Sequence, residues 1–159
     1  MLSLRGMKIQ LVNEELIAEL HKAARGSERL RQNFDLRTTV EDGSQRMLNV
    51  LEPGTQVPIH QHLKTSESVI CIEGCLDWVF YEEQPNVDSG GPVDSSTSEE
   101  TGPGAGCIDQ GPCFKEVARF RVCPREKVYG IQVPKGAWHS IVVHEPSTIF
   151  EAKDGKYGE

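Results

Sequence analysis

Short strand-like runs separated by turn residues fill the chain after Arg31 and constrain its fold more than any other feature. The runs are rich in Val, Ile and Phe, and turn signals such as Pro53-Gly54 and Gly74 interrupt them. No helical pattern lies between the runs, which argues against a parallel α/β sheet. We therefore predict an all-β fold, either a closed barrel or a jelly roll. Its strands are expected over residues 45–52, 55–62, 68–73, 75–81, 114–122, 128–133, 137–143 and 147–152.

One short helix is predicted before these strands, over residues 13–25. Asn13 can cap its N-terminus, two glutamates in the first turn suit the positive end of the helix dipole, and Gly26 can end it. Apolar residues recur at helical spacing and give the helix one apolar face. The length of 159 residues suits a single domain. We expect residues 1–30 to form an N-terminal extension with the helix, and residues 31–159 to form the barrel.

Residues 83–113 form an acidic segment that is rich in Gly, Pro and Ser. The chain has a net charge of −7, and seven acids but no Lys or Arg lie between Glu82 and Asp109. The rest of the chain is therefore balanced, with 24 − 7 = 17 acids against 17 bases. Such a segment cannot bury enough apolar surface to order itself, so we expect a flexible loop between two strands. Three roles are open for such a loop, namely a solvated tether, a lid over a site or an element that binds a partner.

Charge and hydropathy argue against two classes of partner. The balanced body has no basic stripe for nucleic acid. No run approaches the roughly eighteen apolar residues that a membrane helix needs. The first ten residues lack the apolar core of a signal peptide, so a cytoplasmic location is expected. The five cysteines are accordingly expected to be reduced thiols, with a Cys107–Cys113 disulfide as the alternative.

Residues 54–74, GTQVPIHQHLKTSESVICIEG, carry the candidate chemistry. His60 and His62 are two apart on an expected strand, so their side chains project to the same face, roughly 7 Å apart along the chain. Glu67 opens the next expected strand, which can place its carboxylate beside both imidazoles. His139, in VPKGAWHSIVV, completes the set if its strand lies beside the first pair.

Three imidazoles and one carboxylate form a donor set of borderline softness. It suits divalent Fe, Mn, Ni, Co or Zn rather than calcium. Four protein ligands leave one or two coordination positions for water or a substrate, which is what metal-assisted chemistry needs. The sequence therefore predicts one open site for a divalent transition metal.

The same residues resemble the sequence motifs of the cupin superfamily. Gly54, His60, His62, Glu67 and Gly74 match every fixed position of the first motif, G-x5-H-x-H-x4-E-x6-G. The second motif, G-x5-P-x-G-x2-H-x3-N, is met at its Pro, second Gly and His positions, whereas valines replace its first Gly and its Asn. The resemblance implies a cupin jelly-roll β-barrel that holds one metal ion on the four candidate ligands.

Within that superfamily the chain is most similar to the WbuC-type cupin metalloproteins. The similarity covers MKIQLVNEELIAELHKAAR, RLRQNFDLRTTVEDGSQRMLNVLEPGTQVPIHQH and VPKGAWHSIVVHEPSTIFEAKDGKYG. These bacterial proteins are often encoded among genes for surface polysaccharide synthesis, so the resemblance implies a small sugar-like ligand and a homodimer. The chain departs from that family at Ser66, where a tryptophan is usual, and in the length of the insert 83–113.

Three further polar residues are candidates for substrate binding. Arg46 and Asn49 lie on the strand that leads to the first motif. An arginine there can hold a carboxylate or phosphate by a two-pronged contact, and a structural salt bridge is the alternative. Gln56 shares strand alternation with His60, so it can line the same pocket.

Several functions remain open at this stage. An enzyme would use the metal to polarise an oxygen-rich, sugar-like ligand for isomerisation or epimerisation. With iron bound, the same open positions would suit a dioxygenase. A non-catalytic module would bind or sense a small ligand, and a structural site would only stabilise the fold.

Overall fold

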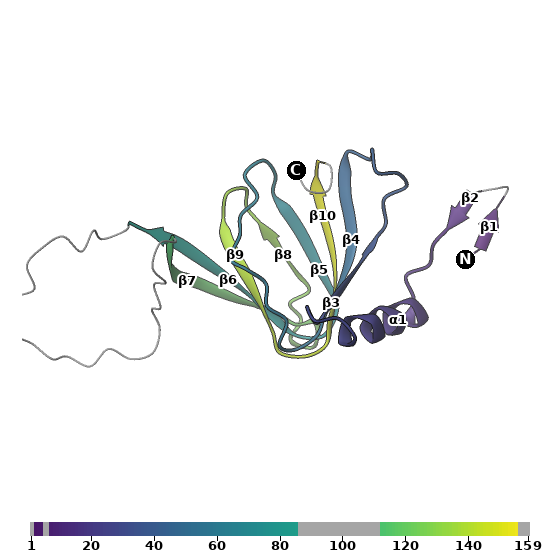
Figure 1. Cartoon of the computed structure of the whole chain (residues 1–159), viewed down its shortest axis with the longest axis horizontal. Helices are drawn as coiled ribbons and strands as arrows, with labels where there is room; N and C mark the ends of the chain where they lie inside the picture. The colour runs from purple at the N-terminus through teal and green to yellow at the C-terminus, as the bar shows by residue number, and fades with distance from the viewer. Residues whose placement is uncertain (1, 5–6, 86–111, 156–159) are drawn as a thin grey trace, which may run out of the picture.

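The computed structural model describes residues 2–4, 7–85 and 112–155, and most of them form two antiparallel β-sheets whose strands fan out from one end of the molecule (Figure 1). The larger sheet has the order β3 (Arg31–Asp35), β4 (Ser44–Leu51), β10 (Ser147–Asp154), β5 (Glu67–Glu73) and β8 (Gly130–Val133). The smaller sheet has the order β7 (Cys113–Val122), β6 (Leu76–Gln84) and β9 (Trp138–Val143). A separate pair, β1 (Leu2–Leu4) and β2 (Met7–Ile9), precedes the helix.

The strand order identifies the architecture. Every pairing among the described strands is antiparallel, yet the last strand, β10, lies between β4 and β5 in the larger sheet. Two packed antiparallel sheets with this non-sequential strand order are the pattern of a jelly roll. The all-β jelly-roll fold predicted from the sequence is therefore confirmed.

Seven of the predicted strands are present, and the strand predicted over 55–62 is wrong. In this segment only His60 pairs, as an isolated bridge to His139. Pro58 has no backbone N–H to donate, which prevents a continuous ladder. The short strand β3 was not predicted, because only one of its five residues, RQNFD, is strongly apolar. Cys107, and with it the alternative disulfide to Cys113, lies outside the described residues, as do residues 86–111 of the predicted insert.

Helix α1 (Glu14–Arg25) lies against the outer face of the larger sheet, at the end from which the strands fan out (Figure 1). The Asn13 side-chain oxygen accepts from the Leu16 backbone N–H at 3.1 Å, as the predicted cap requires. Among the described residues no helix has the length and apolarity to cross a bilayer. The cluster between helix and sheet contains Leu20, Ala24, Leu48 and Val50.

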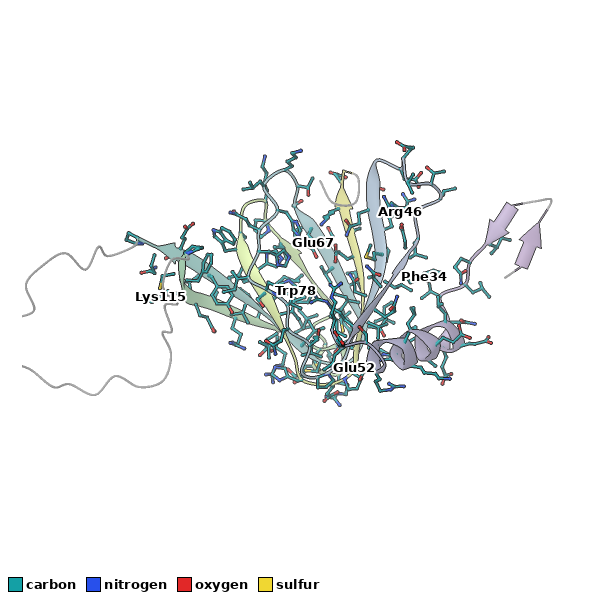
Figure 2. All side chains as sticks on the ribbon, in the orientation of Figure 1. Phe34, Arg46, Glu52, Glu67, Trp78 and Lys115 are labelled. Carbon is teal, nitrogen blue, oxygen red and sulfur yellow. The ribbon has the colours of Figure 1, made fainter. Side chains whose placement is uncertain are left out.

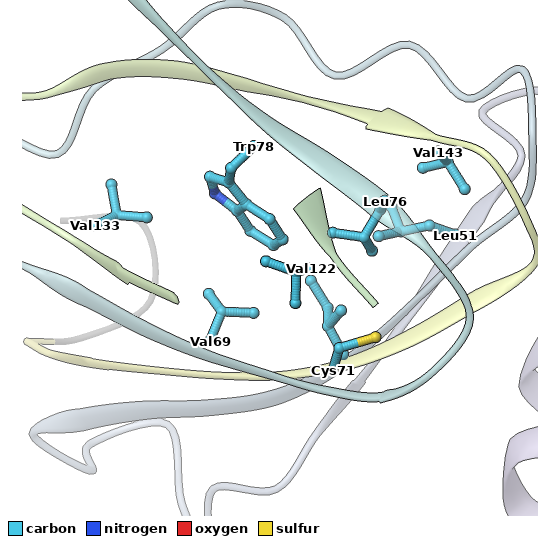
Figure 3. Packing of buried hydrophobic residues seen from close by; sticks show 9 residues of the cluster. Leu51, Val69, Cys71, Leu76, Trp78, Val122, Val133 and Val143 are labelled. Atoms are coloured by element: carbon cyan, nitrogen blue, oxygen red, sulfur yellow. The ribbon is translucent and has the colours of Figure 1, made fainter. Parts of the chain in front are cut away.

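The main core fills the space between the two sheets. Trp78 of β6 is its largest fully buried side chain, and Figure 3 shows it above Val69 and Val122. Because successive residues of a strand face opposite sides, β5 and β6 each give two alternate residues to this core. The buried members are Leu51, Val69, Cys71, Leu76, Trp78, Val122, Val133, Val143 and Ile149.

Gly74, at the tight turn between β5 and β6, is expected to tolerate no side chain. Its φ is +97°, and a Cβ there would lie 2.5 Å from the Pro146 carbonyl oxygen and 2.6 Å from the Ser147 Cα. The backbone strain of a positive φ and the steric overlap of the added Cβ both destabilise the fold. We therefore expect Gly74→Ala to lower the free energy of unfolding by about 3 kcal/mol or more. Gly136 is the matched control, because its φ is +78° but no atom lies within 4 Å of its Cβ position. Urea denaturation should give a loss of only about 1 kcal/mol for Gly136→Ala, and equal losses would contradict this account.

Asp77 of β6 makes stability depend on pH. Its buried carboxylate accepts from Arg121 Nε at 2.9 Å and lies 2.8 Å from His144 Nε2. Burial alone would raise its pKa, but these two partners outweigh burial and lower the pKa to about 2. A lowered folded-state pKa stabilises the protein above the ordinary value near 4, and this stabilisation disappears as the pH falls towards 2.

We therefore expect Asp77→Asn to lose about 1–2 kcal/mol of unfolding free energy at pH 7, since the arginine partner is half-exposed and screened. Urea titrations at several pH values should show the gap between the two proteins closing as the pH falls from about 4 to 2. A gap that is constant across this range would show that the charge of Asp77 is not the cause.

Candidate metal centre

His60 and His139 bring two distant segments of the chain together. The His60 N–H donates to the His139 carbonyl at 3.0 Å, and the His139 N–H donates to the His60 carbonyl at 2.8 Å. Their rings lie on the same side of this bridge, with centroids 4.3 Å apart. His62 follows two residues later, and its ring lies 5.1 Å from that of His60 and 5.6 Å from that of His139. The three imidazoles predicted from the sequence therefore form one cluster.

Backbone carbonyls fix the orientation of two of these rings. His60 Nδ1 donates to the Pro58 carbonyl at 2.9 Å, and His139 Nδ1 donates to the Ala137 carbonyl at 2.9 Å. This tautomer, inferred from the hydrogen bonds, leaves Nε2 of each ring as a lone-pair donor. Burial lowers the pKa of both His60 and His139. Both imidazoles are thus neutral at neutral pH, which is the form that binds a metal ion.

Glu67, the first residue of β5, lies beside the histidines. Its Oε2 is 2.9 Å from His62 Nε2 and 3.9 Å from His139 Nε2. Burial alone would raise the pKa of Glu67, but the hydrogen bond and charge of His62 outweigh burial and lower it. Figure 2 shows Glu67 in the space between the two sheets. The carboxylate is thus held in its charged form next to the imidazole cluster.

The donor atoms suit a metal ion. The ligand nitrogens of His60, His62 and His139 all lie within 4.8 Å of one another. Metal–nitrogen bonds of about 2.1 Å place neighbouring donors about 3 Å apart, so a small contraction of the cluster is enough. These three histidines can hold a divalent transition metal, and a Glu67 carboxylate oxygen lies 2.9 Å from His62 Nε2 at the edge of the cluster.

The histidines open into a cavity of about 480 Å³. Part of its wall comes from alternate residues of β4, namely Gln45, Met47, Asn49 and Leu51. The residues between them face the helix, as Leu48 and Val50 do. Figure 2 shows Arg46, another of these intervening residues, on the outer side of β4.

Two charged residues of β10 that the sequence analysis did not identify also line the cavity. The side chains of Glu151 and Lys153 are only 15% and 11% exposed, and their charged atoms lie 3.8 Å apart. Lys153 Nζ also lies 3.5 Å from His62 Nδ1. Gln45 Nε2 and Asn49 Nδ2 donate to the two Glu151 carboxylate oxygens, the latter at 2.8 Å. Burial and the nearby charge of Glu67 raise the pKa of Glu151 to about 7.

Of the three residues expected to bind a substrate, one lines the cavity and two do not. Asn49 lines the cavity, but its amide already holds Glu151. Arg46 does not line this cavity, and its guanidinium donates to Asp42 at 2.6 Å, which agrees with the salt-bridge alternative. Gln56 is exposed and is not among the lining residues. The structure therefore brings only Asn49 to the metal centre.

One pattern in the sequence could have identified Glu151 and Lys153 as residues of the site. Glu151 and Lys153 are two apart in the run STIFEAKD, so they share a face of the strand, as His60 and His62 were expected to do. Charged residues on the inward face of a strand are rare unless they are paired or functional. The register of β4 and β10, which pairs Lys153 with Gln45, was not accessible from the sequence.

One family model matches part of the chain. Residues 12–90 match a family model described as a domain of unknown function, DUF6016. The match spans 79 of the 159 residues, just under half of the chain. No curated protein matches the sequence.

Several solved structures share the general fold. The cupin domain of Cnp3 from Schizosaccharomyces pombe aligns with a TM-score of 0.49 and 12% identity, over 81% of this chain and 67% of that chain. KdgF from Halomonas sp. aligns with a TM-score of 0.47 and 12% identity, over 79% and 81%. L-ribose isomerase from Cellulomonas parahominis aligns with a TM-score of 0.49 and 15% identity, over 80% and 62%. The jelly-roll assignment follows from the strand order of this chain, in which β10 lies between β4 and β5.

Removing one imidazole should abolish tight metal binding. We expect His139→Asn to weaken the affinity for a divalent transition metal about 100-fold or more, because a ligand and its backbone-fixed orientation are both lost. Competition with a chromophoric chelator measures the affinity, and circular dichroism checks the fold. His144→Asn is the control, since His144 bonds Asp77 outside the cluster. Unchanged affinity in His139→Asn, or an equal loss in both variants, would contradict the assignment.

Proposed function

We propose that this protein is a metal-dependent enzyme that moves a proton on a small, oxygen-rich, sugar-like ligand, as an isomerase or epimerase does. One observation carries the proposal, which is the convergence of three histidines, two shielded carboxylates and one shielded ammonium group in a single cavity. The carboxylates belong to Glu67 and Glu151, and the ammonium group to Lys153. A cavity that only stored an ion would not need the second carboxylate and the lysine.

His60, His62, His139 and Glu67 would hold one divalent ion, with Fe, Mn, Ni, Co and Zn all compatible with this donor set. When bound, the ion supplies Lewis acidity that polarises a carbonyl or hydroxyl oxygen of the ligand. Four protein ligands leave one or two positions for that oxygen. The cavity of about 480 Å³ is large enough for a monosaccharide beside the ion.

Glu151 is the proposed base. Gln45 and Asn49 hold its two oxygens in place, so the carboxylate has a fixed direction inside the cavity. From this position it takes a proton from the carbon next to the ligand carbonyl, and returns it to a neighbouring carbon or to the other face of the same carbon. Lys153 donates to the ligand oxygen that gains negative charge during this transfer.

Two features favour a polyhydroxylated and anionic ligand. Gln45 Oε1 is buried and has no hydrogen-bond partner in the described part of the chain, so a ligand hydroxyl would satisfy it. Arg29, Arg31 and Lys153 line the cavity against two carboxylates, and a divalent ion makes the balance more positive. A sugar acid or a sugar phosphate fits this charge better than a neutral sugar.

The resemblance to WbuC-type cupins extends the proposal to a ligand from surface polysaccharide synthesis and to a homodimer. Two other functions predict different results from the same metal-loaded protein. An iron-dependent dioxygenase would consume O₂ with its substrate. A non-catalytic binding module would retain the ligand without changing it.

Solvent exchange tests the proposed proton transfer before the product is known. Metal-loaded protein in D₂O, incubated with panels of neutral sugars, sugar acids and sugar phosphates, should exchange the C–H next to the carbonyl of an anionic member, as proton NMR detects. We expect Glu151→Gln to slow this exchange by about 100-fold or more, because the general base is lost. Lys153→Met should weaken binding of anionic ligands more than that of neutral ones.

Glu83→Gln is the matched control, since Glu83 is an exposed carboxylate of β6 outside the cavity, and it should exchange at the normal rate. Ligand binding without exchange would overturn the catalytic proposal and leave a binding module. Equal exchange rates in Glu151→Gln and the unaltered protein would remove Glu151 as the base.

A further inference from the structure

Cys75 and Cys123 lie opposite each other at one end of the smaller sheet, just before β6 begins and just after β7 ends. The register of these strands pairs Leu76 with Val122, and one further step places Cys75 across from Cys123. Directly opposed residues of an antiparallel pair have Cα atoms about 4.5–5.5 Å apart, which lies within the range that a disulfide spans. The two sulfur atoms lie within 4.8 Å of each other. Figure 3 shows the neighbouring Leu76 and Val122 in the core.

The two sulfurs differ in their surroundings. The neighbouring Cys75 thiol and the positive charge of Arg125 outweigh burial and lower the pKa of Cys123. Burial raises the pKa of Cys75 to about 11, so this thiol keeps its proton at neutral pH. A stabilised thiolate beside a protonated partner is the arrangement of an attacking cysteine and a resolving cysteine.

We propose that Cys75 and Cys123 form a reversible dithiol–disulfide pair, a modification site separate from the metal centre, with a small hydroperoxide as the oxidant. The Cys123 thiolate attacks the peroxide, which forms a sulfenic acid and releases hydroxide or an alkoxide. The Cys75 sulfur then attacks the sulfenic sulfur and forms the S–S bond, and the sulfenic hydroxyl leaves with the Cys75 thiol proton as one water molecule. Two electrons pass from the two sulfurs to the peroxide, and a thiol reductant reverses the reaction.

A second metal site is the competing interpretation, because a Glu126 carboxylate oxygen also lies within 4.8 Å of both sulfurs. The charge of Arg125 favours the redox pair. Its positive charge lowers the pKa of Cys123 and so favours a thiolate, whereas the same charge opposes a divalent cation. Three ligands, one of them on an exposed residue, would also leave a soft metal incompletely coordinated.

Access to the pair depends on one short turn. Cys123 and Cys75 are only 0% and 4% exposed, so the oxidant must be small. The turn η1 (Pro124–Glu126) follows Cys123 directly, and it is anchored by the 2.5 Å ion pair between Arg125 and Glu145. In the proposed reaction, local opening of this three-residue turn admits the oxidant to the Cys123 sulfur.

Oxidation followed by peptide mapping tests the proposal on the full chain. The reduced protein is treated with a small excess of hydrogen peroxide, quenched with catalase, alkylated in denaturant and analysed by mass spectrometry with and without dithiothreitol. We expect two alkylatable thiols to disappear, a peptide pair linked through Cys75 and Cys123 to form, and dithiothreitol to restore both thiols. Cys71→Ser is the matched control, because Cys71 is another buried thiol but donates to the Glu73 carbonyl at 3.1 Å, and it should oxidise normally.

Two single variants separate the roles of the pair. In Cys75→Ser the Cys123 sulfenic acid has no resolving thiol and should advance to the sulfinic acid, whereas in Cys123→Ser the Cys75 thiol should stay reduced. Retention of all thiols at peroxide levels that oxidise a free thiol would overturn the proposal. So would a crosslink between other cysteines, such as Cys107 and Cys113, or stoichiometric zinc that protects Cys75 and Cys123 from alkylation.

Discussion

The reciprocal pair of backbone hydrogen bonds between His60 and His139 is the constraint on which the rest of the site depends. Within the described part of the chain the segment around His60 has no other strand pairing, so these two bonds set its register against β9. The Gly136 N–H reinforces this register by donating to the His62 carbonyl at 2.9 Å. A shift by one residue would turn the side chains of His60 and His62 to the opposite face. Pro58 has no N–H to donate, so the pairing with β9 does not continue before His60. His60 and His62 therefore lie beside β9 and line the cavity.

The cavity gathers charges that the fold must hold apart from water. Glu67 and Glu151 repel each other, and that repulsion contributes to the raised pKa of Glu151. Lys153, the amides of Gln45 and Asn49, and the histidines offset this cost in the absence of a ligand. A divalent ion would offset it further, which is the physical reason to expect that the ion and the fold stabilise each other. The core around Trp78 provides the rigid base for this polar layer.

The elements that the sequence predicted well are those in which local chemistry decides the outcome. The capped helix α1 and the strands β4 to β10 follow from side-chain periodicity and turn residues, and the motif spacing identified all three clustered histidines. The failures depend on tertiary structure. Residues 55–62 look like a strand but pair only at His60, and Arg46 has the right sequence neighbourhood but the wrong face of β4. Glu151 became visible as a site residue only when β10 was placed between β4 and β5.

The central claim is that one divalent transition metal binds at the histidine cluster. Anomalous diffraction from crystals of the metal-saturated protein, collected on both sides of the absorption edge of that metal, tests it most directly. The account predicts one peak about 2.0–2.3 Å from Nε2 of His60, His62 and His139 and from a Glu67 oxygen. No peak at this position, or a peak bound elsewhere while the three imidazoles keep their present contacts, would contradict it.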